Sequence, residues 1–274
     1  MGFRNGSAIK FVILGLAFTH QNSKSVMETE ITTKKFDVRF SDCDFYSRLR
    51  LSNLFLFMEE TALADAEQNG FGLQSMIKAG YTYVITRMKI RINHMPLWGE
   101  SLSISTWAKD FYQDKVCLKD YSILDAQGNA IAQATSSWLL VNLKTGKAEN
   151  PSNSPFPIPL YPGKNALPEM LDIMVPGEEP TVVNTEEAHY SDLDMNRHVN
   201  HCRYVDWVMD ALNKDEIKNK KIRSIQMNYI NQIPLGGKTN IVRFKDTHHH
   251  AFLFGMNADD MSQCFFQARI GFGD

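Results

Sequence analysis

Three polar side chains alternate along a five-residue stretch of the chain, at Asp194, Asn196 and His198. An extended backbone would place all three on one face. Histidine exchanges protons near neutral pH, asparagine orients a water or a neighbour, and aspartate fixes a tautomer or a loop. A helical apolar pattern begins directly afterwards, and the free N–H groups of a helix N-terminus favour a developing oxyanion. The stretch therefore predicts a site that holds an acyl carbonyl.

The chain carries a second version of this stretch that lacks the asparagine and the histidine. Residues 41–60 align with residues 191–210 at a constant offset of 150. The aspartate recurs as Asp44, whereas Tyr46 and Arg48 replace the other two side chains. The chemistry is therefore predicted in the second copy. A second interpretation stays open for Asp194. Because the aspartate also occurs in the copy without the asparagine and the histidine, its role is then only to cap the start of a helix.

A second pair of matching segments shows that a whole module is duplicated. Residues 92–100 (INHMPLWGE) align with residues 230–238 (INQIPLGGK), in the same order along the chain as the first pair. Eight of the ten prolines fall between Pro151 and Pro180, where neither helix interior nor central strand is expected. We therefore predict an N-terminal module over 31–150, a proline-rich linker over 151–180 and a C-terminal module over 181–274.

Each module is expected to contain one long helix and a largely antiparallel sheet, which makes the fold class α+β. Apolar residues at helical spacing run from Leu51 to Ala62 in the first copy and from Val199 through Cys202 to Leu212 in the second. Alternating segments predict strands. They are 33–40, 84–92, 102–107, 116–124 and 131–141 in the first module, and 181–189, 222–231, 239–244, 251–256 and 264–272 in the second.

Residues 1–30 are expected to be a disordered tail or upstream sequence, with Met27 as the true start. The apolar run from Phe11 to Phe18 resembles a weak signal-peptide core, which is the alternative. This run is too short to span a bilayer, and no other segment is a candidate for a membrane span.

Five segments, several of which overlap the duplicated stretches, carry a resemblance to the acyl-ACP thioesterases of plants and bacteria. They are FMEETALADA (57–66), YVITRMKIRI (83–92), PLWGESLSISTW (96–107), ATSSWLLVNLKTGK (134–147) and YSDLDMNRHVNHCRYVDWVMD (190–210). The resemblance implies a tandem double hotdog, in which a curved sheet wraps each helix and the two sheets join side by side. It also implies hydrolysis of fatty acyl-[acyl-carrier protein] to free fatty acid and carrier protein.

The family places a glutamate followed by a cysteine on the strand after the second helix, and here the sequence departs from it. Alignment through Tyr229 puts Gln232 and Ile233 at those positions, which removes a carboxylate base and a cysteine nucleophile. Gln232 can hold a water but cannot take a proton. We therefore expect water attack assisted by His198 and positioned by Asn196 and Gln232, without a covalent intermediate; a role for Asp194 as base or nucleophile stays open.

The first module is expected to hold the acyl chain. The pocket is predicted beside the first helix, at Leu56, Met58, Thr61 and Ala62. The alternative is that these side chains are ordinary core.

Composition excludes several other classes of protein. The net charge of −2 gives no support for nucleic-acid binding, and no glycine-rich phosphate loop follows a strand. Four cysteines without C-x-x-C spacing indicate reduced thiols and a cytoplasmic location. The run His248–His250 is more typical of a polar loop than of a metal site, so neither a metal nor a cofactor is expected.

The expected partner is acyl-carrier protein with its fatty acyl-phosphopantetheine. A basic stretch that follows the second helix is a candidate docking surface for an acidic carrier protein, with a solvated helix end as the alternative. It consists of Lys214, Lys218, Lys220, Lys221 and Arg223. The sequence leaves a homodimer open.

Three alternative functions remain. An acyl-CoA thioesterase would use the same fold, and a hotdog dehydratase or hydratase would need an acid/base pair that Asn196 and Gln232 do not supply. A non-catalytic acyl-binding module is the third, because fold does not fix function.

Overall fold

The computed structural model describes residues 30–169, 171, 173–175, 177–178, 180–247 and 249–273. Residues 1–29 of the expected tail and His248 lie outside the described residues. Within them, no helix combines the length and the apolar character needed to cross a membrane.

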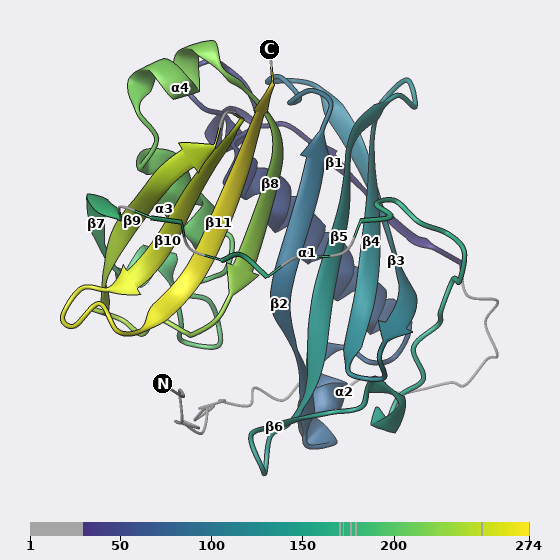
Figure 1. Ribbon diagram of the computed structural model, residues 1–274. Helices are drawn as coiled ribbons and strands as arrows, with labels where there is room; N and C mark the ends of the chain where they lie inside the picture. The colour runs from purple at the N-terminus through teal and green to yellow at the C-terminus, as the bar shows by residue number, and fades with distance from the viewer. Residues whose placement is uncertain are drawn as a thin grey trace.

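The described residues form two modules with the same order of elements (Figure 1). The helices are α1 (Leu51–Gln68), α2 (Leu73–Lys78), α3 (Arg203–Asp210) and α4 (Lys214–Asn219), with 3-10 turns η1 (Phe40–Asp42), η2 (Pro151–Asn153) and η3 (Tyr190–Asp192). The first module contains β1 (Thr32–Asp37), β2 (Tyr81–Ile92), β3 (Ser101–Tyr112), β4 (Val116–Asp125), β5 (Ala130–Asn142) and β6 (Lys147–Glu149). The second contains β7 (Thr181–Glu187), β8 (Lys221–Tyr229), β9 (Lys238–Thr247), β10 (His250–Asn257) and β11 (Cys264–Gly273).

All of these strands join one antiparallel sheet in the order β1-β3-β4-β5-β2-β8-β11-β10-β9-β7, with β6 on β5. The order in the second module mirrors that in the first, so β2 and β8 are equivalent strands that meet at the centre. They pair from Arg87 opposite Asn228 to Arg91 opposite Ser224. The α+β class and the expected side-by-side joining of two helix-and-sheet modules are confirmed.

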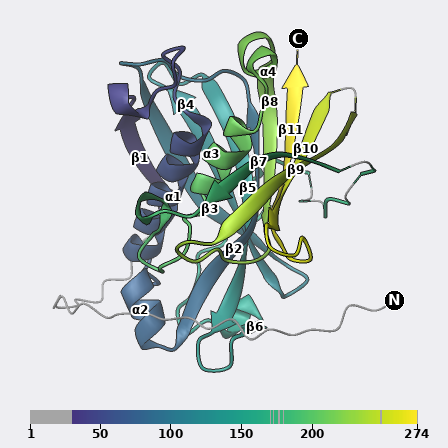
Figure 2. The ribbon, with the colours of Figure 1, turned by 90° about the vertical axis from the view of Figure 1, so that its left-hand side faces the viewer.

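The helices α1 and α3 contact each other on one face of this sheet (Figures 1 and 2). Side chains of both modules form one continuous core there, including Phe55 and Met58 of α1, Ile90 of β2 and Val205 of α3. Alternation along β2 sends Met88 and Ile90 into this core and turns the neighbouring cations to the other face. The duplicated modules therefore share their apolar interior.

The second helix is shorter than the apolar pattern predicts. The pattern runs from Val199 to Leu212, but α3 begins at Arg203. The reason lies in Asn200, whose side-chain oxygen accepts the backbone N–H of Cys202 at 2.8 Å and holds the preceding residues in a turn. The apolar side chains before the helix are buried all the same.

The described part of the proline-rich segment crosses the face of the sheet turned away from α1 (Figure 1). Its backbone accepts hydrogen bonds from Trp107 Nε1 at Lys164 (2.8 Å) and from Arg87 Nη1 at Leu171 (3.0 Å). Glu169 pairs with Lys89 at 3.8 Å and with Arg91. The outward-facing cations of β2 therefore bind to this segment. The segment also contacts the second half of the sheet, because the Met174 carbonyl accepts a hydrogen bond from Gln267 Nε2 at 3.3 Å.

Candidate active site

The stretch predicted to do chemistry forms a tight turn between η3 and α3. The backbone N–H of Asp194 donates to the carbonyl of His198 at 3.0 Å, and that of Arg197 donates to the carbonyl of Asp194 at 3.0 Å. Arg197 has φ of 64°, in the left-handed region. The expectation of an extended approach was wrong, because the Asp194 carboxylate accepts the backbone N–H of Asn196 at 2.8 Å and closes an Asx turn.

The turn nevertheless brings the three predicted side chains together around the aspartate. Asn196 Nδ2 lies 3.4 Å from Asp194 Oδ2. Burial lowers the pKa of His198 below its ordinary value, and the Asp194 charge offsets part of that shift. A lowered pKa keeps the imidazole neutral at neutral pH, which is the form that accepts a proton.

The first copy has the same backbone turn but different side-chain contacts. The N–H of Asp44 donates to the carbonyl of Arg48 at 2.7 Å, and Ser47 has φ of 60°. Here the guanidinium of Arg48 donates to Asp44 Oδ2 through Nε (3.0 Å) and Nη2 (2.9 Å) and lies over the Tyr46 ring at 4.7 Å. The first turn is therefore closed by an ion pair, whereas the second leaves an imidazole at the equivalent position.

The loop that follows β8 lies beside the turn at Asp194. The carbonyl of Ile233 accepts the backbone N–H of Val199 at 2.9 Å. Gln232 therefore stands next to the turn in space, but its side chain is exposed.

The four residues predicted to bind the acyl chain divide between two sides of α1. Met58 and Thr61 are fully buried and Ala62 is 8% exposed. The Thr61 hydroxyl donates to the Phe57 carbonyl at 2.7 Å. Leu56 is 37% exposed, since two residues along a helix turn a side chain away from its neighbour's face.

A residue that the sequence analysis did not single out joins the two modules beside this turn. Glu59 of α1 accepts hydrogen bonds from Asn200 Nδ2 at 3.3 and 3.2 Å. Its carboxylate also lies 3.5 Å from Nδ1 of His201. Burial lowers the pKa of His201, and Glu59 and Asp194 offset part of that shift. A signal for Glu59 was present in the sequence, because it lies four residues after Phe55 and next to Met58, on the apolar side of the predicted helix.

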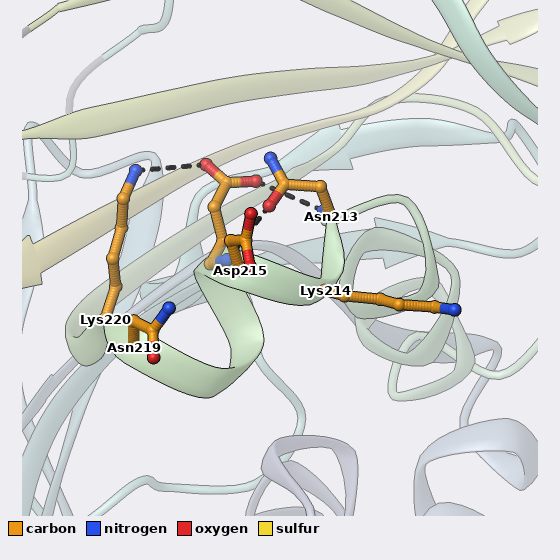
Figure 3. Close-up of a pocket in the computed structure, with 6 residues that line it drawn as sticks. Asn213, Lys214, Asp215, Asn219 and Lys220 are labelled. Atoms are coloured by element: carbon orange, nitrogen blue, oxygen red, sulfur yellow. Dashed lines mark hydrogen bonds and ion pairs between the residues drawn. The ribbon is translucent and has the colours of Figure 1, made fainter.

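A surface pocket lies on α4 and contains none of the predicted catalytic side chains (Figure 3). Lys220 Nζ pairs with Glu216 Oε1 at 3.2 Å, and the Asn213 side chain accepts the Glu216 N–H at 2.9 Å. Arg243 of β9 binds both Glu216 oxygens at 2.7 and 2.8 Å. The start of the basic stretch is therefore an ordered helix fastened to the sheet.

Comparison with known families matches both modules. The model of the acyl-ACP thioesterase N-terminal domain covers residues 29–152, and that of the C-terminal domain covers residues 178–272. The chain belongs to the acyl-ACP thioesterase family. The double-hotdog fold inferred from the sequence resemblance is thereby confirmed, because solved members of the family superpose on both modules.

An acyl-ACP thioesterase from Bacteroides thetaiotaomicron is 25% identical, with a TM-score of 0.76 over 89% of this chain and 98% of that one. A 12:0-ACP thioesterase from Umbellularia californica shares the fold at 17% identity, with a TM-score of 0.72 over 89% and 97% of the two chains. Among curated family members, the chloroplastic palmitoyl-acyl carrier protein thioesterase of Arabidopsis thaliana is 23% identical over 221 residues. That match covers 74% of this chain and 52% of the relative, so the chain spans about half the length of the curated relatives it matches.

Proposed function

We propose that the protein hydrolyses the thioester of fatty acyl-[acyl-carrier protein] and releases free fatty acid and carrier protein. Family membership supports this substrate class. The observation that carries the proposal is the difference between the two equivalent turns. Arg48 is paired with Asp44 in the first turn, while His198 of the second stands at the equivalent position and has a lowered pKa.

In the proposed mechanism, neutral His198 takes a proton from a water molecule as its oxygen attacks the thioester carbonyl. The carbonyl electron pair moves onto oxygen, where the Asn196 amide stabilises the oxyanion. Collapse of the intermediate breaks the carbon–sulfur bond, and the departing thiolate receives the proton from His198. Gln232 orients the water, and Asp194 holds the turn through the Asn196 backbone.

The acyl chain is proposed to lie along α1 in the first module, against Met58, Thr61 and Ala62, whereas Leu56 lies on the other side of the helix and is left out of this pocket. The basic residues of α4 and the start of β8 form the proposed docking surface for the acidic carrier protein. Lys214 and Lys218 are its exposed members on α4. A homodimer is a further proposal, which light scattering tests by giving twice the mass of one chain.

A cytoplasmic location is proposed from the cysteines, all four of which are free thiols. The plant relatives are named chloroplastic, so an experiment must distinguish the cytoplasm from an organelle. Cell fractionation with detection of the endogenous chain tests this. Recovery in an organelle or in the medium would contradict it.

The decisive assay compares acyl-ACP and acyl-CoA side by side, with free thiol as the readout. We expect faster release from the carrier protein. Preferential release from acyl-CoA would favour the acyl-CoA thioesterase, and binding without release would favour the non-catalytic module.

Matched variants locate the chemistry within the molecule. His198→Ala is expected to fold normally and to lose about 10²–10⁴ in turnover, which is the range for a positioned acid/base group. The control is Arg48→Ala at the equivalent position of the first turn, which should keep turnover. Near-normal hydrolysis by folded His198→Ala protein would remove His198 from the mechanism.

A further inference from the structure

Three side chains with metal-binding chemistry converge where the two modules meet. Glu59 comes from α1, whereas His201 and Cys202 come from the turn before α3. One ligand atom from each lies within 4.8 Å of the other two. Cys202 Sγ is 3.6 Å from His201 Nε2 and 3.8 Å from Glu59 Oε2. None of these residues belongs to the proposed proton-transfer machinery.

The two separations from Cys202 Sγ match the edges of a tetrahedral coordination sphere. Zinc bonds of about 2.3 Å to sulfur and about 2.05 Å to nitrogen or oxygen, at tetrahedral angles, place the sulfur about 3.6 Å from the nitrogen or oxygen. A thiolate, an imidazole and a carboxylate are ligands that a borderline-soft divalent ion accepts together. We propose that Glu59, His201 and Cys202 bind a zinc ion that links the two modules.

The surroundings of the three side chains fit this assignment. Asn200 donates to both oxygens of Glu59 and accepts the backbone N–H of Cys202, so one amide orients two of the ligands. Such outer contacts are typical of metal sites. The buried hydroxyl of Tyr229 has no hydrogen-bond partner in the described part of the chain, and its ring meets the His201 ring edge-on at 5.4 Å.

The charge of the cluster also favours a cation. The Glu59 side chain is only 20% exposed, and no lysine or arginine among the described residues pairs with it. A partly buried carboxylate without a cationic partner is costly. When the ion binds, the Cys202 thiol releases its proton to solvent, and the two anionic ligands balance the two charges of the metal. Water completes the four-coordinate site.

The site would fasten the modules at the point where their helices meet. Glu59 belongs to the first module and the other two ligands to the second, so the ion bonds to both. A ligand that binds only the folded state stabilises it. At a free zinc concentration one hundred times the Kd, we expect the melting temperature of the full-length protein to rise by about 5–10 °C.

The test uses the full chain, stripped with a chelator and titrated with Zn²⁺ or Co²⁺. Elemental analysis should find about one zinc per chain, and cobalt should give a thiolate charge-transfer band with tetrahedral d–d absorption. Cys202→Ala should lose the charge-transfer band. Cys264→Ser is the matched control, because this free cysteine lies on β11 outside the cluster and serine keeps its bond to the Phe266 carbonyl.

Glu59→Gln provides a second variant that is expected to fold, because its amide oxygen still accepts from Asn200. It should weaken zinc binding at least about tenfold, and Asn200→Ala should weaken it by about 10–100-fold. The inference fails if wild-type protein binds no zinc, or if Cys202→Ala or Glu59→Gln binds it as well as wild type does. A charge-transfer band that is lost in Cys264→Ser instead would place the ion elsewhere and overturn the assignment.

Discussion

The two equivalent turns predict opposite orders for stability and for activity. In the first, Asp44 accepts the backbone N–H groups of Tyr46 (2.8 Å) and Arg48 (3.0 Å), and its Oδ2 accepts two hydrogen bonds from the Arg48 guanidinium. In the second, Asp194 accepts the backbone N–H of Asn196 at 2.8 Å and a longer contact from its amide. Truncation of Asp44 therefore removes more hydrogen bonds than truncation of Asp194.

The magnitudes follow from these contacts. A hydrogen bond from backbone to a partly exposed carboxylate contributes about 1 kcal/mol, and an exposed ion pair contributes about 0.2–1 kcal/mol. Asp44→Ala should thus destabilise the fold by about 2–3 kcal/mol, and Asp194→Ala by about 1 kcal/mol. For a chain of this size these correspond to melting-temperature losses of about 4–12 °C and about 2–4 °C.

Activity should show the reverse order. Asp194→Ala releases the turn that places Asn196 and His198, and small misplacement of catalytic groups costs about 10²-fold in turnover. Asp44→Ala should keep turnover near the wild-type value well below its melting temperature. Asp194→Asn is a useful intermediate, because its amide oxygen still closes the turn.

Two assays on the same preparations test these orders. Thermal denaturation, monitored by circular dichroism, ranks the variants by stability, and thiol release from acyl-ACP ranks them by activity. Equal loss of turnover in folded Asp44→Ala and Asp194→Ala would refute a division of labour between the turns. A larger melting-temperature loss in Asp194→Ala than in Asp44→Ala would refute the hydrogen-bond reasoning.

Three further predictions concern pH, chain length and α4. Because the pKa of His198 is lowered, kcat/KM should decrease only when the pH falls below about 6.5. Asp194→Asn should shift this acidic decrease to lower pH, because it removes the charge that raises the His198 pKa. An unchanged pH profile in the variant would contradict an electrostatic interaction between Asp194 and His198. Met58→Trp should shift the released fatty acids toward shorter chains, since each methylene left unburied loses about 0.8 kcal/mol; an unchanged profile in stable protein would place the pocket elsewhere. Bonding to Arg243 lowers the pKa of Glu216 to about 2, so Glu216→Gln should cost about 3 kcal/mol at neutral pH. That stabilisation is full above the unfolded pKa near 4.5 and is lost as pH falls toward 2, so the free energies of unfolding of the variant and the wild type should become equal there. Denaturant unfolding that gives the same difference between the two proteins at all pH values would contradict this.

The architecture was largely readable from the sequence because it depends on repeated local patterns. Alternation along 84–92 marked β2, and the matching segments around Asp44 and Asp194 revealed the duplication. The short helices α2 and α4 were not predicted, since six residues give too little apolar periodicity.

The contacts across the modules could not be read in the same way. Glu59 and His201 are far apart in sequence, and only the joining of α1 and α3 brings them together. The shape of the turn at Asp194 was also missed, because an alternating polar pattern does not distinguish a strand from an Asx turn. Residue types predict a chemistry for this turn, but the local hydrogen bond to the Asp194 carboxylate sets its geometry.

The proline-rich crossing makes the meeting of the two modules a unimolecular event. The pairing of β2 with β8 extends over only five residue pairs from Arg87 to Arg91. Between separate chains such an association would weaken on dilution, but a tether holds the partner at an effective concentration that dilution does not change. Unless the whole chain dimerises, the fold should thus keep the same unfolding midpoint from nanomolar to micromolar protein.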